Sequence, residues 1–101
     1  MNELIQYIKK NVNGRKQKIG VMCGVFDKDN HAVYIGWSKV NMKAGDKFEA
    51  KKGLSIARER TKATSEKSIP TLPTSIKKPM SLFQTRCTKY FKEIPLGFTL
   101  V

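Results

Sequence analysis

The sequence predicts an α+β fold: an antiparallel β-hairpin or small sheet packed against two amphipathic helices, with a short N-terminal helix. Two observations carry this prediction. Residues 18–26 and 31–40 are rich in β-branched and aromatic residues on either side of a turn, and residues 79–93 repeat apolar side chains at helical spacing. Because 101 residues is the length of one ordinary domain, we expect residues 1–101 to form a single domain.

Residues 2–12 are expected to form the N-terminal helix, because their apolar residues recur at the spacing of one helix face. Asn2 could cap this helix, and Asn13 with Gly14 favours its end. The apolar residues are Leu4, Ile5, Ile8 and Val12.

Residues 18–26 and 31–40 are expected to pair as an antiparallel hairpin, because residues 27–30 (Asp-Lys-Asp-Asn) are typical of a turn. Alternation along each strand places one apolar set on one face of that strand. Three glycines leave gaps that would admit a closely packed helix, a ligand or a neighbouring backbone. The apolar sets are Ile19, Val21, Cys23 and Val25 on the first strand and Val33, Ile35 and Trp37 on the second; the glycines are Gly20, Gly24 and Gly36.

After a loop over residues 41–46, residues 47–64 are expected to form a helix, with Asp46 as its N-cap and Glu49 in a capping-box position. One face of this helix carries mostly small residues, which favours close packing on a sheet. Glycine inside a helix costs about 1 kcal/mol relative to alanine, and a close contact at Gly53 would explain its presence. The small face comprises Ala50, Gly53, Leu54 and Ala57.

Three prolines and several Ser and Thr residues make residues 65–79 a predicted linker without helix or inner strand. Pro79 suits the first turn of the helix over residues 79–93, whose apolar stripe is predicted to form core. Residues 98–101 could add a third short strand. The stripe comprises Met80, Phe83, Cys87, Tyr90, Phe91 and Ile94.

The net charge of +12 is the strongest indication of a partner, because 20 Lys and Arg face only eight Asp and Glu. Such a balance favours nucleic acid, an anionic membrane surface or an acidic protein. The excess is +4 over each of residues 1–20, 51–67 and 68–101, whereas residues 21–50 are neutral. Sixteen of the cations are Lys, which favours contact with a phosphate backbone over the reading of bases.

Two groups of residues are candidates for nucleic-acid binding. Four cations would fall within about a 60° sector of the central helix, where they would either follow phosphates or form an ordinary solvated face. The second strand offers aromatic residues beside a cation, which is typical of stacking on single strands, although a lone tryptophan is also common in a core. The predicted ridge is Lys47, Lys51, Arg58 and Lys62, with Arg60 nearby; the strand group is Trp37 and Lys39 with Tyr34.

Known catalytic and metal-binding patterns are absent from the sequence, so we expect no enzyme activity, no cofactor and no metal. Cys23 and Cys87 lack the further ligands that zinc needs and are expected to be reduced and buried, which suits the cytoplasm. Asp27 and Asp29 suit the turn itself, and His31 has no nucleophile at a recognisable motif. No apolar run reaches the roughly 20 residues of a membrane span.

Residues 34–38 (YIGWS), 46–48 (DKF) and 53–60 (GLSIARER) resemble small uncharacterised accessory proteins of large tailed bacteriophages, over roughly residues 18–92. The resemblance implies a phage origin and brings no established activity. Residues of this signature would either meet in space as one site or serve as the turn, cap and packing residues of the fold. They are Gly36, Trp37, Ser38, Asp46, Phe48 and Arg58.

The predicted function is therefore a non-enzymatic phage protein that contacts nucleic acid through its phosphates and modulates host or phage DNA or RNA processes. Two alternatives stay open. One is an inhibitor of an acidic host protein, such as a nuclease or a defence enzyme. The other is a binder of a small anionic nucleotide at the Arg58 end of the central helix.

Overall fold

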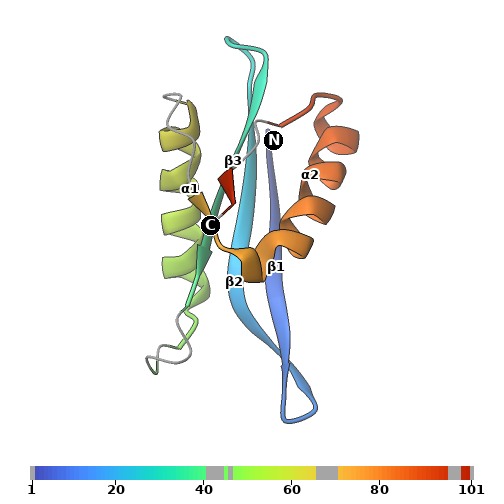
Figure 1. Ribbon diagram of the computed structural model, residues 1–101. Helices are drawn as coiled ribbons and strands as arrows, with labels where there is room; N and C mark the ends of the chain where they lie inside the picture. The colour runs from blue at the N-terminus through green and yellow to red at the C-terminus, as the bar shows by residue number, and fades with distance from the viewer. Residues whose placement is uncertain (1, 41–44, 46, 66–70, 96–98, 101) are drawn as a thin grey trace.

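The computed structural model describes residues 2–40, 45, 47–65, 71–95 and 99–100. Its centre is a three-stranded antiparallel sheet in the order β1 (Glu3–Val12), β2 (Arg15–Asp27) and β3 (Ala32–Lys39). Two helices, α1 (Ala50–Ser65) and α2 (Lys77–Phe91), flank this sheet (Figure 1). A parallel pair, β4 (Thr71–Leu72) with β5 (Thr99–Leu100), lies apart from it, and a 3₁₀ helix (Thr74–Ile76) leads into α2. The predicted α+β class, antiparallel sheet and two helices are confirmed.

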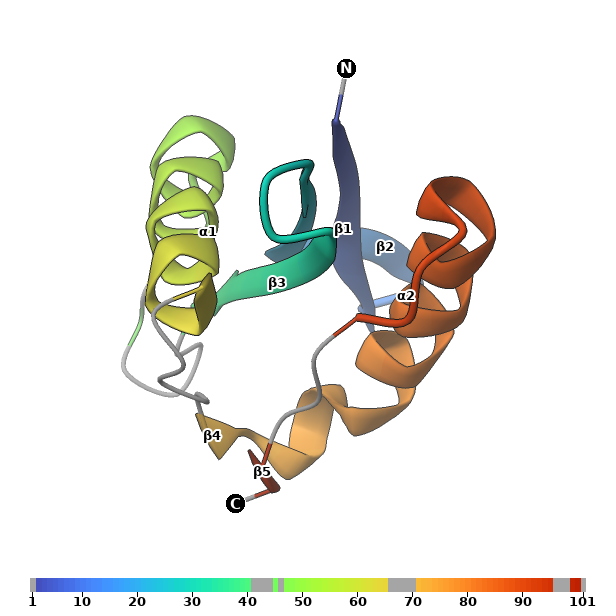
Figure 2. The same ribbon diagram turned by 90° about the horizontal axis from the view of Figure 1, so that it is seen from above.

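The two helices cover opposite faces of the sheet, and the core is therefore divided into two clusters (Figure 2). On one face, α2 packs Met80, Phe83 and Cys87 with side chains of all three strands, among them Ile8, Met22 and Ile35. On the other face, Ala57 of α1 packs with Val21 and Cys23 of β2. The middle strand β2 is thus buried on both sides.

The approach of α1 to β3 is unusually close, as the small residues on that helix predicted. A Cβ atom on Gly36 would lie 1.9 Å from the carbonyl oxygen of Ala57, so only glycine fits there. The Ser38 hydroxyl donates a hydrogen bond of 2.8 Å to the carbonyl oxygen of Gly53. Gly53 in turn faces the Phe48 ring, which a Cβ would meet at 2.6 Å. The predicted close contact at Gly53 is therefore confirmed.

The predicted N-terminal helix over residues 2–12 was wrong, because this segment is β1. Its apolar residues do not share one face: Leu4 and Ile8 pack on the α2 side of the sheet, and Ile5 packs on the α1 side. A strand covered by helices on both faces loses the simple alternation of a half-buried strand, and here the result imitates a helical period. Asn13 and Gly14 form a two-residue hairpin turn, both with positive φ, instead of a helix end.

The predicted face of Ile19 was wrong, because a β-bulge in β2 turns this side chain to the α2 side of the sheet. Ile8 pairs with Gly20 and Lys9 pairs with Lys18, so Ile19 is the extra residue between them. Its side chain therefore joins the cluster under α2, whereas Val21 and Cys23 face α1. The predicted set on β3 shares one face as expected, since Val33, Ile35 and Trp37 all belong to the α2 side.

The start of α1, the linker and the partner of the last short strand also differ from expectation. Helix α1 begins at Ala50 and not at residue 47, and Asp46 lies outside the described residues. The predicted linker over 65–79 contains β4, the 3₁₀ helix and the first residues of α2, which accommodates Pro79 in its first turn. The third short strand is β5, which pairs with β4 and not with the main sheet.

The apolar stripe of α2 is only partly core. Met80, Phe83 and Cys87 are buried and Phe91 is half-buried, as predicted. Tyr90 is 55% exposed and Ile94, which follows the helix, is 79% exposed. The stripe stops contributing to the core at Phe91 because Lys92 adopts a left-handed conformation and ends the helix.

We predict that Gly36→Ala destabilises the fold by about 1–3 kcal/mol or more, because the added methyl group forces α1 away from β3. Chemical denaturation followed by circular dichroism would measure the free energy of unfolding. The control is Ser55→Ala on the exposed side of α1, which should change stability by less than about 0.5 kcal/mol. Equal stability of both variants would show that α1 does not sit on Gly36.

Candidate nucleic-acid interface

The hairpin of β1 and β2 is long, and its turn end projects beyond both helices (Figure 1). Val12 pairs with Arg15 around the Asn13–Gly14 turn, so the hairpin stays paired up to its tip. Paired strands hold their side chains at fixed spacing. Whatever the tip carries is therefore presented to solvent on an ordered support.

We call residues 9–18, at the turn end of this hairpin, the basic hairpin, because they include five cations and no acidic residue. No Asp or Glu occurs between Glu3 and Asp27 in the sequence. The Lys18 ammonium lies 4.2 Å from the centre of the Tyr7 ring, which holds it in place by a cation–π contact. All five of its cations are exposed: Lys9, Lys10, Arg15, Lys16 and Lys18.

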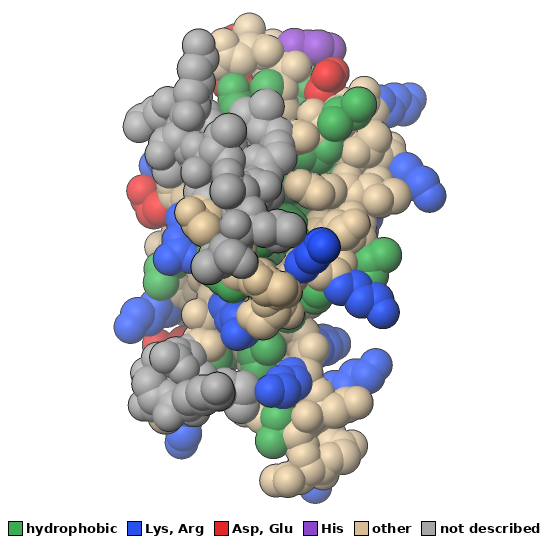
Figure 3. All heavy atoms as spheres, in the orientation of Figure 1, with side chains coloured by type: hydrophobic (Ala, Val, Ile, Leu, Met, Phe, Trp, Pro, Cys, Tyr) green, Lys and Arg blue, Asp and Glu red, His purple; other side chains and the backbone are tan. Residues whose placement is uncertain are grey.

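At the base of the basic hairpin lies a groove of about 660 Å³, which we call the Trp37 groove. Its lining combines four cations with apolar side chains that include Ile8, Ile19 and Trp37, and it contains no acidic residue among the described ones. Figure 3 shows apolar atoms between Lys and Arg side chains on the lower part of one face of the protein. The cations are Lys9 and Lys10 of β1, Lys39 of β3 and Arg60 of α1.

Arg60 reaches the groove around the free edge of β3. Its helix covers one face of the sheet, whereas the Trp37 side chain belongs to the other face. The guanidinium group donates a hydrogen bond of 2.7 Å to the Trp37 carbonyl oxygen and lies 4.8 Å from the centre of the indole ring. Arg60 thus provides a planar cation stacked on a planar aromatic ring at the groove wall.

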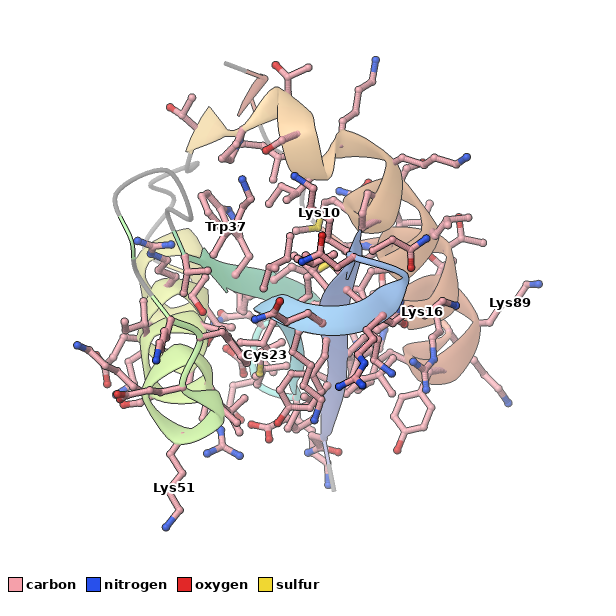
Figure 4. The ribbon with its side chains drawn as sticks, turned by 90° about the horizontal axis from the view of Figure 1, so that it is seen from below. Lys10, Lys16, Cys23, Trp37, Lys51 and Lys89 are labelled. Carbon is pink, nitrogen blue, oxygen red and sulfur yellow. The ribbon has the colours of Figure 1, made fainter. Side chains whose placement is uncertain are left out.

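Trp37 is not an ordinary core residue. The indole is half-buried, and its Nε1 atom is buried without a hydrogen-bond partner among the described residues. An unsatisfied buried N–H costs about 1–3 kcal/mol, so most folded proteins pair it. Figure 4 shows Trp37 and Lys10 on the same side of the sheet, whereas Lys51 points into solvent from α1.

Lys39 closes the other side of the groove. Its ammonium donates a hydrogen bond of 3.1 Å to the Ser75 hydroxyl, which belongs to the 3₁₀ helix before α2. Ser75 and two prolines, Pro73 and Pro79, also line the groove. Three of the seven residues predicted to bind nucleic acid, Trp37, Lys39 and Arg60, therefore meet at one place.

The other four predicted residues, Lys47, Lys51, Arg58 and Lys62, do not line this groove. Lys47 precedes α1, so the predicted helical ridge contains only Lys51, Arg58 and Lys62. The Lys62 ammonium lies 3.3 Å from a carboxylate oxygen of Glu59 on the same helix.

Arg58 is a structural residue at the α1–β1 contact. It donates two hydrogen bonds, of 2.8 and 3.2 Å, to the two carboxylate oxygens of Glu3. This fork lowers the pKa of Glu3, chiefly through the hydrogen bond from the guanidinium group. The Arg58 guanidinium group thus already has a carboxylate partner, and the anionic-nucleotide site at this residue stays a prediction.

The described signature residues of the phage resemblance do not all gather at one place. Gly36, Ser38 and Phe48 serve the packing of α1 on the sheet, while Arg58 pairs with Glu3. Trp37 belongs to the opposite face, and Asp46 lies outside the described residues. Ser38 and Phe48 also line a common pocket of about 420 Å³ next to the start of α1.

The basic hairpin was missed at the sequence level because residues 2–12 were interpreted as a helix. A helix over these residues would not place Lys9 and Lys10 beside Trp37, and it would leave residues 15–18 as a connecting segment. The Asn13–Gly14 pair was the available signal, since this dipeptide between two apolar runs favours a two-residue hairpin turn.

The titratable residues in the described part of the chain mostly serve local contacts. No group of three or more His, Cys, Asp or Glu residues gathers there as a metal site. Asp27 accepts hydrogen bonds from the backbone amides of Asp29 and Asn30, so it serves the turn, as predicted. His31 lies 3.1 Å from a carboxylate oxygen of Glu93 and contacts the Phe26 ring.

The two cysteines are free and buried, as predicted, and they face opposite sides of the sheet. Cys23 packs under α1, and Cys87 of α2 packs on the other face, beside Gly24. Burial raises the pKa of each thiol to about 12, with the nearby Glu3 carboxylate adding to the effect at Cys23. Neither thiol is therefore ionised near neutral pH.

We predict that both thiols resist a thiol-specific reagent at pH 7.5 in the native protein and react fully in concentrated urea. The reason is that attack requires an exposed thiolate. Counting released chromophore against time would measure both rates, and a mass measurement would detect a disulfide. Rapid native reaction, or a mass lower by two hydrogens, would contradict this picture of the core.

We predict that Arg60→Ala uncovers the Trp37 ring and increases quenching of its fluorescence by neutral acrylamide. Trp37 is the only tryptophan in the chain, so the emission reports this site alone. Lys62→Ala, two residues further along α1, is the matched control and should leave quenching unchanged. Identical quenching of wild type and Arg60→Ala would show that the guanidinium group does not cover the indole.

No protein-family model, curated protein or solved structure matches this chain. Within its described part, none of the helices is both long and apolar enough for a membrane crossing. The basic hairpin and the Trp37 groove are therefore the features that bear on function, and the resemblance to phage proteins stays a prediction.

Proposed function

We propose that this protein binds nucleic acid through its phosphates, with the basic hairpin as the main contact. The observation that carries the proposal is the set of five exposed cations on a paired hairpin segment without acidic residues, whose turn end projects beyond both helices (Figure 1). Cations that contact phosphates release condensed counterions, and this release drives binding that is insensitive to sequence. The net charge of +12 supports the same partner.

The choice of the hairpin over the predicted α1 ridge follows from charge pairing. Two of the three ridge residues on α1 lie beside carboxylates, Arg58 at Glu3 and Lys62 at Glu59. A cation that already has a counter-charge releases fewer counterions when it meets a phosphate. In the basic hairpin, by contrast, the nearest acids in the sequence are Glu3 and Asp27, at the far ends of its strands.

Four of the five hairpin cations are Lys, and this composition bears on specificity. Lysine acts as a point charge, whereas arginine forms a planar fork that matches base edges. We therefore propose contact with the backbone and little preference for sequence. A phage accessory role in host or phage DNA or RNA processes, without catalysis, is compatible with such binding and remains part of the proposal.

We predict that replacing Arg15, Lys16 and Lys18 together by Gln weakens binding to mixed-sequence oligonucleotides. The slope of log K against log[salt] should fall by about two to three, close to one unit per lost phosphate contact. Fluorescence anisotropy of labelled oligonucleotides over a range of salt concentrations would measure the slope. Thermal denaturation would confirm that the variant is folded.

The matched control replaces Lys28, Lys51 and Lys62 by Gln, which removes the same charge outside the basic hairpin. This control should retain most of the wild-type slope. A larger loss in the control than in the hairpin variant would return the interface to the α1 ridge. If wild type binds no nucleic acid near physiological salt but retains a host protein through nuclease treatment and moderate salt, inhibition of an acidic host protein becomes the better hypothesis.

A further inference from the structure

The Trp37 groove has a composition that phosphate binding alone does not require. Its cations would suffice for a backbone, yet its lining also includes Ile8, Ile19, Val40 and an indole ring. An apolar lining with convergent polar groups is typical of a site for an organic ligand, and a volume of about 660 Å³ is in the range of such sites. The groove therefore suits a ligand that is anionic at one part and flat and apolar at another.

The groove is also continuous with the basic hairpin, since Lys9 and Lys10 belong to both. Lys9 pairs with Lys18 across the hairpin, directly after the bulge that turns Ile19 toward the groove. A strand of phosphates that follows the hairpin would thus arrive at the groove without crossing an acidic side chain of the lining. The bulge accordingly links the two surfaces.

The stack of Arg60 on Trp37 supplies the surface for a base. Guanidinium planes and indole rings are the groups on which proteins stack unpaired bases. The guanidinium group is held by its hydrogen bond to the Trp37 carbonyl oxygen, with its central carbon over the indole ring. The buried Trp37 Nε1–H lacks an acceptor among the described residues, and a base carbonyl reached by a small side-chain shift would supply one.

We infer that the Trp37 groove binds an unpaired nucleotide, so that the protein prefers single-stranded nucleic acid to duplex. This inference rests on the proposed function and adds the substrate class to it. The base stacks at the Arg60–Trp37 wall, and its flanking phosphates contact Lys10 and Lys39. In a duplex the bases are stacked on each other and only the backbone is offered, so a duplex engages the hairpin without the groove.

The first test needs no variant, because it changes the ligand. Wild-type protein is titrated with a 12-residue oligothymidylate, the matching oligouridylate, a hairpin duplex with the same number of phosphates, and a 12-residue strand in which abasic sites replace the bases. We expect at least one of the two single strands to quench Trp37 fluorescence. This strand should bind about 5- to 150-fold more tightly than the abasic strand and the duplex, which is the gain in affinity that corresponds to stacking of one base. Equal affinity for the abasic strand would overturn the inference.

The second test separates the groove from the basic hairpin. Arg60→Met keeps an unbranched, flexible side chain and removes the planar cation, and Lys62→Met is its control on the same helix. Arg60→Met should weaken single-strand binding at least fivefold while duplex affinity changes less than threefold. Thermal denaturation checks that both variants fold.

The outcomes of the two proposals are distinct. If the variant with Arg15, Lys16 and Lys18 replaced loses affinity for every ligand while Arg60→Met loses none, the hairpin is the interface and the groove inference fails. If no oligonucleotide binds at all, the proposed function itself fails. A selective loss of single-strand binding in Arg60→Met would support the inference.

Discussion

The close contact between α1 and β3 is the constraint on which the rest of the arrangement depends. Gly36 leaves no room for a Cβ atom under the Ala57 carbonyl, and Ser38 ties the first turn of α1 to the same strand. With the helix held this near to the edge strand, Arg60 can pass around that edge and cover Trp37 on the opposite face. A helix a few ångströms further away would leave the indole without its cation.

Burial on both faces of the sheet has a second consequence for the charges. With α1 on one side and α2 on the other (Figure 2), the middle of the sheet offers no surface for cations, and the lysines of β1 and β2 all lie in the half of the hairpin nearest its turn. Helix α1, in contrast, lies next to Glu3 of β1, where Arg58 finds its partner. Packing thus leaves some cations beside a carboxylate and others exposed at the end of the hairpin.

The same two-sided burial explains where sequence reasoning failed. The segments β2 and β3 kept enough β-branched and aromatic character to be recognised, as did the glycine gaps that admit the helices. In β1, apolar residues serve both faces, and the spacing of Leu4, Ile5 and Ile8 imitates a helix. Nothing in a local window distinguishes these cases, because the second helix that makes β1 two-sided lies more than sixty residues away in the chain.

By itself the sequence determined the α+β class, the close seat of the central helix, the free buried thiols and the basic character, because each of these follows from residue type and short-range spacing. It also identified Trp37, Lys39 and Arg60 as candidates. Only the tertiary structure decided that these three meet Lys9 and Lys10 in one groove. It also decided that Arg58 forms an ion pair with Glu3, away from that groove. The physical reason is that β1, β3 and α1 are brought together by long-range pairing and packing, which fix the neighbours of a charge independently of its place in the chain.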